Sequence, residues 1–138
     1  MPGLTLIEMS VVIGVILSLI SATFAGANAW KNGSSRTHCV VNIRNVQQAV
    51  RCYQNVHGYN PGNPVRPLDG NQSIARQLYD REYIRPHTYN QVLGTEPCPG
   101  GGYYNVTDVS QFPAPGELFI ECSLAVSQKH TPNISRDW

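Results

Sequence analysis

The sequence carries four cysteines, whose thiols can form disulfide bonds or bind metal ions. Cys39, Cys52, Cys98 and Cys122 all lie after a long apolar run that ends at Ala29. An even number of cysteines in a short exported domain favours disulfides over free thiols and indicates an oxidising compartment. Zinc binding by the four thiols would need closely spaced pairs, and no C-x-x-C pair is present. We therefore expect no metal and no cofactor.

The spacing of the cysteines limits how they can pair. Cys39 and Cys52 are 13 residues apart on one expected helix. That spacing separates them by about 20 Å, whereas a disulfide needs Cα atoms within about 7 Å. Cys98 precedes the glycines 100–102, and Cys122 ends an expected strand. A Cys98–Cys122 bond that closes a β-hairpin is our first prediction. Two bonds from the helix to the rest of the head are the alternative.

No arrangement of catalytic residues is visible in the sequence. The histidines are dispersed at expected helix edges and in loops, so we expect them to be exposed: His38, His57, His87 and His130. No Ser-His-Asp order, paired carboxylates, phosphate loop or haem motif appears. The net charge is +1, and the basic residues are scattered. We predict that the protein is neither an enzyme nor a nucleic-acid-binding protein.

One carboxylate, Glu8, stands at the edge of the apolar run. From Met9 to Ala29, 21 residues carry no charge. A helix of that length reaches about 30 Å, which is enough to cross a bilayer. A carboxylate at the edge of the hydrocarbon region is costly unless it is neutralised. Glu8 either sits among lipid headgroups or has a positive partner.

The elements that position these residues can be predicted from periodicity. Apolar residues recur every three or four positions from Cys39 to Tyr53, which predicts that the apolar helix continues as an amphipathic one. It should end near Gly58. An irregular loop over 58–71, a short helix over 73–84 and two strands, over 103–109 and 118–122, should follow. The predicted fold class is α+β: a long N-terminal helix packed on a small head with a short antiparallel sheet.

The segment "GLTLIEMSVVIGVILSLISA" resembles the N-terminus of type IV pilins and type II secretion pseudopilins. The resemblance implies that a prepilin peptidase cuts after Gly3 and that Leu4, the new first residue, is N-methylated. It also implies that Glu8 of one subunit pairs with the terminal amine of a neighbour. More diffusely, "CVVNIRNVQQAVRCY", "CPGGGYY" and "ECS" resemble the small heads of pseudopilin-G-like proteins.

This resemblance implies a domain order and a function. We expect a leader at 1–3, a transmembrane and filament-core helix at 4–30, and a pilin head at 31–138. The chain would be a subunit of a homo-oligomeric helical filament, built by a pilus or type II secretion machinery. It would lie in a bacterial inner membrane before assembly and in a surface or periplasmic filament afterwards. The alternative is a monomeric, single-pass, membrane-anchored binding protein.

Four N-x-S/T triplets could accept glycans. They begin at Asn32, Asn71, Asn105 and Asn133. Most such triplets in bacteria are unmodified, so chance occurrence in an Asn-rich chain is the simpler interpretation. A glycosylated filament is the alternative.

Overall fold

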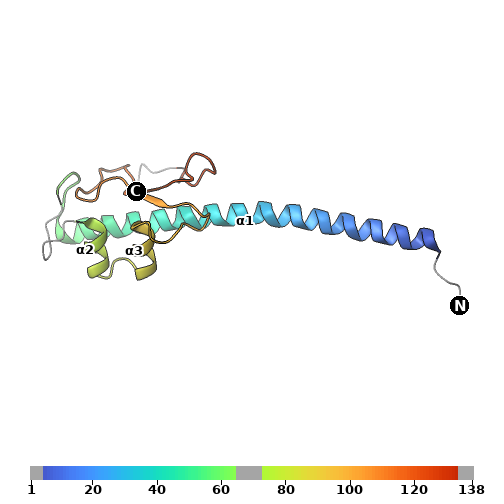
Figure 1. Cartoon of the computed structure of the whole chain (residues 1–138). Coiled ribbons are helices and arrows are strands. Elements are labelled where there is room, and N and C mark those ends of the chain that lie inside the picture. The colour runs from blue at the N-terminus through green and yellow to red at the C-terminus, as the bar shows by residue number, and fades with distance from the viewer. Residues whose placement is uncertain (1–4, 65–72, 134–138) are drawn as a thin grey trace. The chain divides into compact units, whose positions relative to one another are not determined.

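A computed structural model describes residues 5–64 and 73–133. Its helices are α1 (Leu6–His57), α2 (Ile74–Asp80) and α3 (Pro86–Val92). The strands β1 (Tyr104–Val106) and β2 (Ile120–Cys122) form one antiparallel sheet (Figure 1). The predicted α+β class is therefore confirmed. The chain divides into two compact units, Met1–Ser34 and Ser35–Trp138, and the second is called the head below.

The first unit consists of the N-terminal part of α1, whose apolar side chains are exposed. Leu6 is 92 % exposed and Phe24 is 69 % exposed. Four hydroxyl groups in this stretch do not need outside partners, because each donates to a carbonyl one turn earlier in the helix. These donors are Ser10, Ser18, Ser21 and Thr23. Among the described residues, α1 is the one helix long and apolar enough to cross a membrane.

The end of α1 lies where the sequence predicted it. Gly58 adopts a left-handed conformation with φ at 69°. The Tyr59 N–H donates to the Gln54 carbonyl at 2.9 Å, which is the hydrogen bond of a Schellman motif. Glycine suits this position because a Cβ atom makes the left-handed conformation costly. No break interrupts α1 at Gly26 or Gly33.

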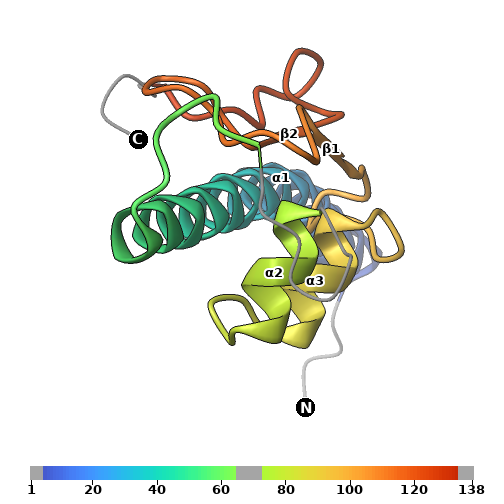
Figure 2. The ribbon, with the colours of Figure 1, turned by 90° about the vertical axis from the view of Figure 1, so that its left-hand side faces the viewer.

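In the head, the C-terminal half of α1 lies between the β-hairpin and the α2–α3 pair (Figure 2). The core runs along the apolar stripe of α1 that the sequence predicted. Tyr53 is central to it: its ring packs near Tyr83 and Phe112, and its hydroxyl donates to the buried Gln77 of α2 at 2.6 Å. The stripe comprises Cys39, Ile43, Val46, Ala49, Val50 and Tyr53.

The two predicted strands pair with each other but are shorter than expected. Tyr104 lies opposite Cys122, and Val106 lies opposite Ile120. The first strand ends early because the Asp108 carboxylate accepts hydrogen bonds from the backbone N–H groups of Ser110 and Gln111, at 2.8 and 3.2 Å. These bonds turn the backbone away from the sheet.

The predicted helix over 73–84 is wrong in extent. α2 ends at Asp80, and Glu82 takes a left-handed conformation with φ at 62°. Pro86 opens α3 at its first position. Proline is favoured there because its missing N–H would have no partner within the helix.

Gln47 is polar, yet it is buried on the same face of α1 as Ile43 and Val50. Its amide donates to the Glu117 carbonyl and accepts from the Phe119 N–H, both at 2.8 Å. Gln47 thus attaches the loop between the strands to α1. The sequence could not reveal this, because both partners lie about 70 residues away.

Gln47→Leu should destabilise the head by about 1–3 kcal/mol, because it leaves the buried Phe119 N–H without an acceptor. Urea unfolding of the detergent-solubilised chain, followed by near-ultraviolet circular dichroism, measures this. Gln48→Leu is the control, since Gln48 is the exposed neighbour on the same helix. Equal stabilities of the two variants would contradict the role given to Gln47.

Candidate functional site

Four side chains from three separate segments of the head converge in its interior. Cys39 comes from α1, Cys98 from the turn after α3, Cys122 from the end of β2, and His130 from the segment that follows β2. All four are buried, and their potential ligand atoms lie within 4.8 Å of one another. We call this group the Cys3His cluster.

Within the cluster, two distances define the packing around Cys122. Its Sγ lies 3.6 Å from the Cys98 Sγ and 3.8 Å from the His130 Nδ1. The Leu124 N–H also points at the Cys122 sulfur, at 3.5 Å. A backbone N–H directed at a sulfur stabilises negative charge on it.

A tight turn holds Cys98. The Gly101 N–H donates to the Cys98 carbonyl and the Cys98 N–H donates to the Gly102 carbonyl, both at 2.8 Å. Gly101 has a φ of 85°, a conformation that glycine adopts at little cost. The Cys-Pro-Gly-Gly-Gly sequence at 98–102 therefore folds back on itself and presents the thiol inward.

The position of the His130 imidazole depends on Gly100, another glycine of this turn. A Cβ atom on Gly100 would lie 2.4 Å from the imidazole Cε1 of His130. The His130 N–H donates to the Leu124 carbonyl at 3.3 Å. The imidazole is thus held between the chain that follows β2 and the Cys98 turn.

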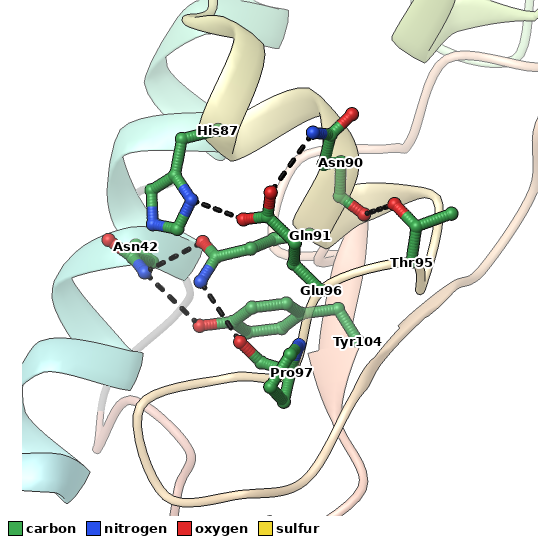
Figure 3. Close-up of polar contacts among 8 residues, drawn as sticks. All are labelled: Asn42, His87, Asn90, Gln91, Thr95, Glu96, Pro97 and Tyr104. Carbon is green, nitrogen blue, oxygen red and sulfur yellow. Dashed lines mark hydrogen bonds and ion pairs between the residues drawn. The ribbon is translucent and has the colours of Figure 1, made fainter.

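A polar network fixes the segment before Cys98 (Figure 3). The Asn42 amide of α1 donates to the Gln91 side chain of α3 at 3.2 Å, and Gln91 donates to the Pro97 carbonyl at 3.1 Å. Near the other end of α3, the Glu96 carboxylate contacts His87 and accepts from the Asn90 amide. These bonds tie α1, α3 and the residue that precedes Cys98 to one another.

The same network reaches Cys39 through Tyr104. The Asn42 amide donates to the Tyr104 hydroxyl at 3.4 Å, and this hydroxyl is hydrogen-bonded with the Cys39 thiol. Burial raises the pKa of Tyr104, so its hydroxyl stays protonated and can donate to the sulfur. Tyr104 on β1 thus connects the strand pair to the Cys39 side of the cluster.

Burial also sets the protonation of the cluster. It raises the pKa of the Cys39 and Cys122 thiols. It lowers the pKa of His130, an effect to which the positive charge of Arg36 adds. Without a bound cation, the Cys39 and Cys122 thiols are therefore protonated and the His130 imidazole is neutral. Such a group can bind a soft metal ion after its thiols lose protons, or it can be oxidised to a disulfide.

The structure places the predicted cysteine pair side by side, as free thiols. The Cys98–Cys122 bond itself stays a prediction. The sequence-based pairing left out two members of the cluster. Cys39 lies against the pair, and His130, which we expected to be exposed, is 1 % exposed. Cys52 is exposed and outside the cluster.

The signal for this convergence was present but weak. A cysteine followed by proline and three glycines predicts a tight turn around the thiol. Cys122 ends the second predicted strand, and His130 follows it by eight residues. The prediction of no metal rested on the absence of closely spaced cysteine pairs. A set of ligands that depends on long-range contacts contains no such pairs.

Glu8 lies in the first turn of α1, where it caps the helix. Its Oε2 accepts from the Thr5 N–H at 2.7 Å and from the Thr5 hydroxyl at 2.8 Å, while the Glu8 N–H points at the same hydroxyl oxygen at 3.4 Å. This reciprocal arrangement is a capping box. The T-x-x-E spacing of residues 5–8 could have predicted it. Gly3 and Leu4 lie outside the described residues.

Three of the four possible glycosylation sites are exposed: Asn32, Asn105 and Asn133. Asn105 lies on β1, between two residues whose side chains face the head. Asn71 lies outside the described residues. Exposure makes these amides accessible to modification, and the modification itself stays untested.

Gly100→Ala should destabilise the head by about 1–3 kcal/mol, the usual cost of overpacking a core, because the new methyl group displaces His130. In a His130→Ala background, the same change should cost much less. Urea unfolding of the wild type, both single variants and the double variant measures this coupling. Additive effects would mean that Gly100 and His130 do not meet.

Comparison with known proteins found no match: no family model, no curated protein and no solved structure corresponds to this chain. The structure supports a coarser statement. A long apolar N-terminal helix followed by a small head with a two-stranded antiparallel sheet is consistent with a pilin-like architecture. The apolar helix suggests membrane association or secretion.

Proposed function

We propose that this chain is a structural subunit of a type IV pilus-like filament, extracellular or periplasmic, and not an enzyme. One observation carries the proposal: a fully exposed apolar helix opens with a carboxylate inside the "GLTLIEM" motif. Lipid would cover the helix before assembly, and the helices of neighbouring subunits would cover it afterwards. A prepilin peptidase and a pilus or type II secretion machinery would be its partners, with no role for nucleic acid.

The exposed side chains of α1 require such a cover. Twelve large hydrophobic residues from Leu6 to Phe24 are at least 45 % exposed, and burying each fully is worth about 1.5–3 kcal/mol. The serine and threonine hydroxyls of this stretch already bond to the backbone of α1. The segment can therefore enter lipid or a helix bundle without leaving a hydroxyl unpaired.

The capping role of Glu8 is compatible with a second role in assembly. Both contacts with Thr5 fall on Oε2. The other carboxylate oxygen could accept from the positive amine that cleavage after Gly3 creates on a neighbouring subunit. Thr5 stays in the chain after this cleavage, so the cap survives processing. Capping alone, however, would equally account for a glutamate at this position.

A monomeric, membrane-anchored binding protein is the competing function. It would have the same exposed helix and the same cap, but its helix would stay in lipid. Electron microscopy of sheared cell-surface fractions separates the two functions. Fibres that contain this chain support the filament, whereas recovery of the chain only as detergent-soluble monomers supports the anchor.

Glu8→Gln should abolish filaments while the protein still reaches the membrane. Glutamine also serves in capping boxes, so this variant retains the helix start and removes only the charge. Inside a helix bundle, the neighbour's amine would lose its partner at a cost of about 3–5 kcal/mol. Filament yield by electron microscopy, normalised to membrane-bound protein, is the measurement.

Thr5→Ala is the matched control for this variant, because it removes the hydroxyl half of the capping box and keeps the charge. We expect Thr5→Ala to form filaments and Glu8→Ala to form none. Filaments from Glu8→Gln at the wild-type yield would contradict the ion pair. Failure of Thr5→Ala together with normal Glu8→Gln filaments would assign Glu8 to capping alone.

Cleavage after Gly3 should make Leu4 the first residue of the assembled protein, with one added methyl group. Intact-mass spectrometry of sheared filaments checks this directly. A variant with a bulky residue at the cleavage site, Gly3→Leu, should keep its leader and stay in the membrane. Assembled material that retains Met1 would exclude the processing step.

A further inference from the structure

We propose that Cys39, Cys98, Cys122 and His130 bind one zinc ion in a tetrahedral site that staples the β-hairpin to α1. The three thiolates and one imidazole form a closed set of four ligands, the arrangement of structural zinc sites. This proposal does not depend on the filament function. It replaces our expectation from the sequence that no metal is bound.

The distances of the cluster fit such a site. Zinc binds sulfur at about 2.3 Å and nitrogen at about 2.0–2.1 Å, so neighbouring ligand atoms of a tetrahedron lie about 3.5–3.8 Å apart. The Cys98 and Cys122 sulfurs are 3.6 Å apart, and the His130 Nδ1 is 3.8 Å from the Cys122 sulfur. With every ligand atom within 4.8 Å of the others, small side-chain shifts suffice to surround an ion.

One divalent ion offsets two of the three negative charges that the thiolates carry. Binding releases three protons, one from each thiol, and forms three Zn–S bonds and one Zn–N bond to the neutral imidazole. The bound site then carries one net negative charge. Arg36 acts on His130 through its positive charge and would offset part of this charge. A set of three sulfurs and one nitrogen in tetrahedral geometry favours zinc over magnesium or calcium, which prefer oxygen.

Groups around the cluster are placed to support thiolates. The Leu124 N–H points at the Cys122 sulfur, and the Tyr104 hydroxyl is hydrogen-bonded with Cys39. The Cys98 turn is held by two backbone hydrogen bonds of 2.8 Å each. Such outer partners orient the ligands of a metal and tune its affinity.

A Cys98–Cys122 disulfide is the competing chemistry, and an oxidising compartment would favour it. That bond would use two sulfurs and give no role to the third thiol or to the imidazole. The structure brings all four together, from three segments of the head. The burial of His130 beside three thiols is the observation that favours a metal.

Alkylation of the full-length chain in detergent, isolated from its native membrane without reductant, separates the two chemistries. Cys52 is exposed and should react with iodoacetamide at once. The three cluster cysteines should react only after a zinc chelator is added, with no reductant needed. Elemental analysis of the untreated chain should find one zinc per chain. If the cysteines react after reductant and not after chelator, or if the chain contains no zinc, the proposal is overturned.

Cobalt titration of the metal-stripped chain provides a second test, because Co²⁺ in a tetrahedral thiolate site has intense visible bands and a sulfur-to-cobalt charge-transfer band. Loss of an outer partner typically weakens metal binding about 10–100-fold, and Tyr104→Phe should weaken cobalt binding within that range. His130→Ala and Cys39→Ser remove ligands and should weaken cobalt binding more than that. Cys52→Ser is the control and should bind as the wild type does. An octahedral spectrum, or equal binding by Cys39→Ser and wild type, would contradict the site.

Discussion

Every short element of the head depends on the C-terminal half of α1, because none of them could stand alone. Helices of seven residues are too short to be stable in water, and a two-stranded hairpin is marginal at best. The apolar stripe of α1 from Cys39 to Tyr53 extends for about 21 Å and offers all of them a common surface. The length of that stripe therefore limits how large the head can be.

Apolar packing on one stripe does not by itself determine where the hairpin lies along it. Polar contacts fix its loop end, where Gln47 bonds to the backbone of Glu117 and Phe119, and the Arg51 guanidinium donates to the carbonyls of Pro113 and Ala114 at 2.7 Å each. Its open end, where Tyr104 faces Cys122, lies at the Cys3His cluster. The hairpin is thus held to α1 at both ends.

Features of the fold that depend on residues close together in the sequence could be predicted, and features that depend on distant residues could not. The long helix, its end at Gly58 and the two strands arise from local patterns, and the sequence predicted them. The T-x-x-E capping box is equally local, although the prediction from the sequence treated Glu8 only as a charge. By contrast, the burial of Gln47 and His130 depends on partners that folding brings from other segments. A single sequence contains no periodicity that reports such contacts.

The position of the cluster along α1 gives a reason for placing a staple there. Cys39 is the first buried residue of α1, at the start of the stripe on which the head is packed. No residue of α1 before Cys39 is buried, so the open ends of the strands would separate from the helix first. Side-chain packing is weakest where a core ends, and a metal or a covalent bond does not depend on core size. Gln47 and Arg51 hold only the loop end of the hairpin to α1. A metal or covalent link between the hairpin and α1 therefore stabilises the head most at the open end of the hairpin.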